Sequence, residues 1–205
     1  MSDLLKRTIS SIILLPITLY FLLQGSFYLI FLITIFFLVA SYEWFNMTKK
    51  VSHKILGLIF LFFSFFTFYE ISNNLFWIYV LSVCISTDLG GYIFGKIFKG
   101  PKLTKISPNK TYAGMIGGFF LSLITLFVFF IWINEEISII WFIITILLSF
   151  ISQVGDITIS YFKRLSKIKN TGKIIPGHGG LLDRIDGMIF AFPFFYFIEI
   201  TGYLL

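Results

Sequence analysis

Long apolar segments alternate with short polar connections along the whole chain. A helix that crosses a bilayer needs about 20 predominantly apolar residues. The segments of about that length are residues 8–24, 27–47, 55–71, 75–95, 112–133, 137–161 and 185–205. The pattern predicts an all-α fold: a polytopic integral membrane bundle of about seven transmembrane helices in a single membrane domain, residues 1–205. It leaves open that the second and third segments are re-entrant or tilted.

The composition supports the membrane class. Hydrophobic residues make up 58% of the chain, aromatic residues 20% and charged residues only 13%, whereas a soluble domain is about half apolar and about a quarter charged. The single cysteine, Cys84, excludes an internal disulfide and a cysteine-based zinc site. The first apolar segment lacks a cleavage pattern, so we expect an uncleaved first span rather than a signal peptide.

Lysine and arginine gather in alternate connections between the apolar segments. All 16 lie before residue 8, at 49–54, at 96–110, at 163–173 or at Arg184, and the intervening connections hold only glutamates. Because basic loops stay in the cytoplasm, we expect a cytoplasmic N-terminus, an inner (cytoplasmic) membrane location and polar loops that face the cytoplasm. The net charge of +6 fits a membrane surface and anionic phosphate ligands, and no nucleic-acid partner is expected.

Four aspartates lie within or at the ends of apolar segments, where a charged side chain in lipid is energetically costly. Asp88 and Asp156 precede the basic loops by eight and seven residues, which places each about 11 Å below its loop. Asp183 and Asp186 open the last span, and their i, i+3 spacing predicts one shared helix face. Ionisable groups within spans mark function by default, and carboxylate oxygens suit Mg²⁺. We therefore predict that Asp156, Asp186, Asp183 and Asp88 form a metal site.

Simpler roles compete with this interpretation. A single aspartate within a span is about as often an ion-pair partner or a helix cap as a ligand, and Asp183 could cap a helix with Arg184 as its partner. Glu43, near the inner end of the second span, is interpreted as a structural anchor to Lys49 or Lys50.

The first basic loop combines hydroxyl and ammonium groups. Ser107, Lys110 and Thr111 are a set suited to phosphate oxygens. The Gly-x4-Gly-Lys spacing of Gly90 to Lys96 is similar to a phosphate-binding P-loop. However, Ile97 replaces the required Ser or Thr, and the stretch lies within an apolar span, so this motif is rejected. Gly91 and Gly95, with Gly114 and Gly118, are spaced for close helix packing instead.

The second basic loop is rich in glycine. It begins at Lys163 and Arg164 and ends in Pro176-Gly177-His178-Gly179-Gly180. Glycines allow close approach of the backbone to a ligand and offer amide groups to phosphate. His178 is one of only two histidines and is a candidate site residue in this setting, although a lone histidine is often structural.

Together these motifs resemble the phosphatidate cytidylyltransferase family, also called CDP-diacylglycerol synthase. The family's C-terminal signature corresponds here to Ser160-Tyr161-Phe162-Lys163-Arg164, Lys169-Asn170, Pro176 to Gly180, and Asp183-Arg184-Ile185-Asp186. Upstream, the similar elements are Asp88, Tyr92, Gly95-Lys96, Ser107-Pro108, Lys110-Thr111, Gly114 and Gly117-Gly118. The departures are Asn170 and Ala113 in place of acidic residues, and Asn109 in place of a common lysine.

The resemblance implies a nucleotidyltransferase that uses CTP and phosphatidate in the bilayer and yields CDP-diacylglycerol and pyrophosphate. It further implies Mg²⁺, a second cation such as K⁺, a homodimer, and a catalytic half at about 75–205 that follows N-terminal spans over 8–71. The catalytic candidates are Asp156, Asp183, Asp186, Lys163, Arg164, His178 and Arg184. The substrate-binding candidates are Ser107, Lys110, Thr111, Ser160, Gly179 and Gly180.

Two other functions remain open from the residues alone. One is CTP-dependent chemistry on another lipid acceptor, which the motifs separate poorly from the first. The other is a membrane ion or solute transporter, in which buried carboxylates form an ion path. Transporters commonly contain inverted repeats and broken helices near the midplane. This chain has neither in its sequence, so the enzyme is favoured.

Overall fold

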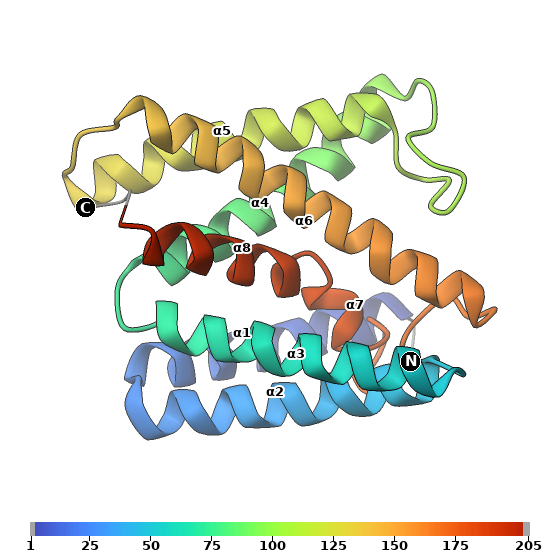
Figure 1. Cartoon of the computed structure of the whole chain (residues 1–205). Coiled ribbons are helices and arrows are strands. Elements are labelled where there is room, and N and C mark those ends of the chain that lie inside the picture. Colours follow the sequence, from blue (N-terminus) through green and yellow to red (C-terminus); the bar gives the residue numbers. More distant parts are fainter. Residues whose placement is uncertain (1–2, 203–205) are drawn as a thin grey trace. The chain divides into compact units, whose positions relative to one another are not determined.

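The computed structural model describes residues 3–202, except for the side chains of residues 3–11, 15 and 26, and the described chain is helical (Figure 1). The helices are α1 (Asp3–Gln24), α2 (Ser26–Met47), α3 (Val51–Ile71), α4 (Phe76–Phe98), α5 (Tyr112–Ile133), α6 (Ile139–Leu165), α7 (Leu182–Ile185) and α8 (Met188–Ile200). The prediction of an all-α fold is confirmed, and most predicted spans match a helix to within a few residues.

Among the described residues, five helices, α2 to α6, are long and apolar enough to cross a membrane. The described apolar part of α1 is Ile12–Gln24, and α8 covers Met188–Ile200. At 1.5 Å per residue, α8 is about 20 Å long, shorter than the roughly 30 Å hydrocarbon core. The structure thus supports a multi-pass membrane protein.

The last predicted span is interrupted near its start. Helix α7 ends at Ile185, Asp186 and Gly187 form a turn, and α8 begins at Met188. Asp183 and Asp186 therefore do not lie on one continuous helix, and the prediction of a shared helix face was wrong. Periodicity counts residues and cannot register a turn that is as short as two residues.

The chain divides into two compact units. Unit 1 comprises residues 1–69 and 162–185, with α1, α2, α3, the last turn of α6, the connection 166–181 and α7. Its packing centres on Trp44 of α2. The Trp44 indole N–H donates to the His53 carbonyl at 3.0 Å, its ring meets Phe162 edge-on at 4.9 Å, and Gly57 of α3 leaves room for it.

Unit 2 comprises residues 70–161 and 186–205, with α4, α5, most of α6, and α8. Helices α4 and α5 approach closely at Gly90, because glycine has no side chain there. A Cβ added at Gly90 would lie 2.3 Å from the Gly117 carbonyl oxygen. The expected helix-packing role is confirmed at Gly114, where an added Cβ would lie 2.6 Å from the Gly91 carbonyl oxygen. Buried Tyr79 of α4 is hydrogen-bonded to Thr145 of α6 at 2.6 Å, and its ring contacts Phe195 of α8.

Candidate active site

In unit 2, the first basic loop meets the C-terminal half of α6. Lys110 Nζ lies 2.5 Å from Asp156 Oδ2, and both side chains are about one-quarter exposed. The Ser160 hydroxyl, one turn further along α6, donates to Asp156 Oδ1 at 3.3 Å. Two candidates one turn apart on α6 and a third from the first basic loop thus form one polar group, in which the ammonium neutralises the carboxylate.

Local backbone contacts fix the position of Lys110. The Lys110 N–H donates to the Ser107 carbonyl, and the Lys110 carbonyl accepts from Leu103 N–H. Pro108 suits this tight turn because its φ is preset and it has no N–H to satisfy. Thr111 then caps α5, since its hydroxyl oxygen accepts from Gly114 N–H at 3.1 Å. The hydroxyl predicted to bind substrate is thus used to begin a helix.

The segments that carry Asp156 and Asp186 contact one another within unit 2. Gly155 lies against the turn before α8, so that an added Cβ would be 2.9 Å from the Asp186 carbonyl oxygen. Asp186 is 8% exposed, and its carboxylate accepts from Gly187 N–H at 3.0 Å. Asp88 of α4 is exposed.

In unit 1, Lys163 and Asp183 form a second ion pair. Lys163 Nζ donates to Asp183 Oδ1 at 2.8 Å, and the two side chains are 9% and 7% exposed. Asp183 Oδ2 accepts from the backbone N–H groups of Thr171 at 2.9 Å and Gly180 at 3.1 Å. The carboxylate therefore joins Thr171 to Gly180 within the connection 166–181, which we call the signature loop.

The Pro-Gly-His-Gly-Gly stretch forms the tip of the signature loop. Ile175 and Gly179 exchange backbone hydrogen bonds of 3.0 and 3.2 Å across the tip. Gly177 and Gly179 adopt positive φ of 78° and 94°, which explains the glycines there. The His178 carbonyl accepts from the Arg184 guanidinium at 2.7 Å. Arg164 donates to the Ile168 carbonyl at 3.0 Å, so both arginines support the loop.

The sequence analysis did not identify Glu43 as part of this arrangement. Its buried carboxylate accepts from Thr171, Leu181 and Leu182. Among the residues that the structure describes, it forms no ion pair with Lys49 or Lys50, so the predicted anchor was wrong. Partners more than 120 residues away leave no local pattern. The only available signal was an acidic residue at the inner end of a span.

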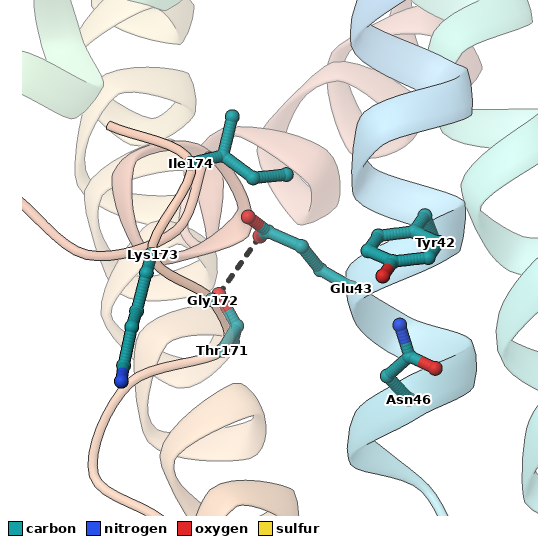
Figure 2. Close-up of a pocket in the computed structure, with 7 residues that line it drawn as sticks. All are labelled: Tyr42, Glu43, Asn46, Thr171, Gly172, Lys173 and Ile174. Carbon is teal, nitrogen blue, oxygen red and sulfur yellow. Dashed lines mark hydrogen bonds between the residues drawn. The ribbon is translucent and has the colours of Figure 1, made fainter. Parts of the chain in front are cut away.

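A cavity of about 440 Å³ lies in unit 1 beside this contact. Its lining includes Tyr42, Glu43 and Asn46 of α2 together with residues 171–174 of the signature loop (Figure 2). None of these was a candidate in the sequence. In Figure 2 the Glu43 carboxylate points from α2 toward Thr171, between helix and loop.

The four-aspartate metal site stays a prediction. Within residues 3–202, no group of three or more His, Cys, Asp or Glu side chains is gathered closely enough to hold a metal ion. The structure instead places Asp156 and Asp183 each against a lysine, in unit 2 and unit 1 respectively.

Comparison with known proteins adds a family assignment. The model of the cytidylyltransferase family matches residues 54–201. The phosphatidate cytidylyltransferase of Rickettsia felis is 36% identical over 95% of this chain and 91% of its own length. That of Rickettsia bellii is also 36% identical, over 97% and 91%. That of Staphylococcus saprophyticus is 47% identical over 52% of this chain and 42% of its own. The chain therefore belongs to the cytidylyltransferase family, as its motifs had indicated.

Proposed function

We propose that this protein is a phosphatidate cytidylyltransferase, which transfers CMP from CTP to phosphatidate within a membrane. The observation that carries the proposal is similarity along nearly the whole chain to proteins of that name, at 36% identity over 95% of the residues. The Lys110–Asp156–Ser160 group and the ordered signature loop add the polar chemistry that such a reaction needs.

The reaction needs positioning and charge neutralisation more than covalent catalysis. A phosphate oxygen of phosphatidate attacks the α-phosphorus of CTP, a P–O bond forms, and the bond to the β-phosphate oxygen breaks as pyrophosphate leaves. The lipid phosphate is already a nucleophile, so no enzyme-bound intermediate is required. Groups that hold the two substrates in line and neutralise their charge therefore contribute most.

Lysines of both basic loops are suited to hold phosphate oxygens. Lys110 is held on a structured turn, and its charge is balanced by Asp156. We infer that triphosphate oxygens compete with Asp156 for Lys110, and that Ser160 keeps the carboxylate oriented. Lys163 and Arg164 offer further cationic groups at the end of α6.

The carboxylates of Asp156 and Asp186 fit Mg²⁺ by chemistry, because they are hard oxygen donors on segments that contact one another. When bound, the cation would neutralise charge on the nucleotide phosphates. Asp183 already accepts three hydrogen bonds, so we assign it the supporting role, with Asp88 as a second supporting carboxylate. A second cation such as K⁺ is part of the same proposal.

The proposed topology has seven spans and a cytoplasmic N-terminus. Five helices are long and apolar enough to span, and we propose that α1 and α8 complete the set in an inner bacterial membrane. The alternation of basic and acidic connections supports cytoplasmic placement of the 99–111 and 166–181 loops. CTP then reaches the site from the cytoplasm, and phosphatidate reaches it from the bilayer. A homodimer is proposed with it.

Labelled CTP tests the function directly. Purified protein in detergent–lipid micelles is expected to form CDP-diacylglycerol from CTP and phosphatidate with Mg²⁺, and not with EDTA. An acceptor panel with isoprenoid alcohols and ether lipids tests the lipid class. Asp156→Asn is expected to abolish incorporation, because the variant loses the carboxylate charge. Full activity in that variant contradicts the role of Asp156, and no turnover by the parent protein contradicts the function.

A further inference from the structure

Glu43 is the most thoroughly enclosed carboxylate among the described residues of unit 1. Its side chain on α2 is 1% exposed. Oε1 accepts from Leu181 N–H at 3.0 Å, and Oε2 accepts from Leu182 N–H at 2.9 Å and from the Thr171 hydroxyl at 2.9 Å. A carboxylate that accepts backbone N–H groups forms stronger, shorter hydrogen bonds than a neutral acceptor does. Glu43 thus binds Thr171 within the signature loop and, at the same time, the junction of the loop with α7.

The loop is shaped to receive this side chain. A Cβ added at Gly172 would lie 2.5 Å from Glu43 Oε1, and one at Gly180 would lie 2.5 Å from Oε2. Side chains do not fit at that distance, so both glycines are required by the approach of the carboxylate. Neither has positive φ, which leaves close contact, rather than turn geometry, as the reason for glycine.

Thr171 connects Glu43 to the catalytic candidates. Its hydroxyl donates to Glu43, while its N–H donates to Asp183, which in turn pairs with Lys163. Leu181 and Leu182, which also bind Glu43, immediately precede Asp183 in the chain. The orientation of Asp183 and Lys163 therefore depends on a carboxylate that touches neither of them.

We propose that Glu43 is a positioning residue for the nucleotide-handling groups of the signature loop. It acts through Thr171 and the Leu181–Leu182 backbone, and it holds Lys163 and Asp183 in the geometry that binds CTP. This inference rests on the proposed function for its catalytic part only, since the ordering of the loop by Glu43 is independent of the substrate.

The sharpest variant is Glu43→Gln, which keeps the shape of the side chain. Both carboxylate oxygens accept from N–H groups, so whichever way the amide of Gln turns, its NH₂ faces a backbone N–H. We expect kcat/KM for CTP to fall by about tenfold or more, and the unfolding midpoint to fall modestly, because a buried backbone N–H loses its acceptor. Thr171→Val is expected to show the same loss and Thr171→Ser to retain activity within about twofold, because serine keeps the hydroxyl.

Trypsin cleavage gives a readout that needs no turnover. Lys167, Lys169 and Lys173 are exposed along the loop, and we expect Glu43→Gln to be cut there about tenfold faster than the parent, because cleavage follows the opened population. The matched control is Glu135→Gln, which removes the same charge at an exposed site and is expected to change neither measurement. Unchanged cleavage and unchanged kcat/KM in Glu43→Gln overturn the inference. If Glu43→Gln is cleaved faster but the parent protein itself never turns over CTP, the proposed function is overturned and the positioning of the loop by Glu43 still stands.

Discussion

Some side chains that the sequence marks as site candidates also make structural contacts, and the sequence alone cannot separate the two roles. Asp183 is both a signature residue and the acceptor of three hydrogen bonds within its own loop, and Thr111 is both a predicted phosphate contact and a helix cap. The motifs singled out both positions as site candidates. They could not assign the contacts of either residue, because a hydroxyl or a carboxylate offers the same atoms to a substrate, a metal or a backbone.

The buried pair Lys163–Asp183 allows a prediction at this scale. Lys163→Met leaves Asp183 buried without its cation, which costs ~3 kcal/mol when a buried pair is broken on one side. We expect a lower unfolding midpoint in detergent for this variant. The double variant Lys163→Met with Asp183→Asn removes both charges and is expected to recover most of the stability, while CTP turnover stays lost. If Lys163→Met were as stable as the parent, the Lys163–Asp183 pair would contribute little to the free energy of unfolding.

At the scale of helices, hydropathy was sufficient for most boundaries and failed at one. Segments such as 112–133 coincide with their helices, because a long apolar run in a membrane protein has no alternative to a helix. The break between α7 and α8 was not predicted. Asp186 and Gly187 form a turn that ends one helix before the next begins, but two residues are too few to interrupt the apolar segment in the sequence. Spacing predicted Gly114 as a packing glycine, but it did not predict Gly90 and Gly117, where α4 and α5 also approach closely.

The contact of α4 with α5 gives a prediction with an internal control. Gly90→Ala would place its Cβ 2.3 Å from the Gly117 carbonyl oxygen, and we expect it to destabilise the protein by ~1–3 kcal/mol, as overpacking usually does. Gly91→Ala would place its Cβ 3.8 Å from the nearest atom, the Gly114 carbonyl oxygen, and is expected to be neutral or stabilising because alanine favours helix. Thermal unfolding in detergent measures both. Equal midpoints for the two variants would argue against close packing at Gly90.

At the scale of the whole molecule, charge distribution predicts an orientation that labelling can check. In a Cys84→Ala background, we expect a membrane-impermeant maleimide to modify Glu136→Cys in intact cells and Lys105→Cys only after permeabilisation. The reason is that basic connections stay in the cytoplasm and acidic ones do not. The background itself is expected to give no label. The reverse pattern would invert the proposed topology and place the 99–111 loop outside the cell.

The contact between Glu43 and Leu182 has a consequence for the order of assembly during synthesis. The two residues are 139 positions apart, and at 5–20 residues per second a ribosome needs roughly 10–30 s to pass from one to the other. For that interval, α2 must be inserted with a carboxylate whose final hydrogen-bond donors do not yet exist. The closing of this contact is therefore a late event in biogenesis, one that reports that the signature loop and α7 have been made.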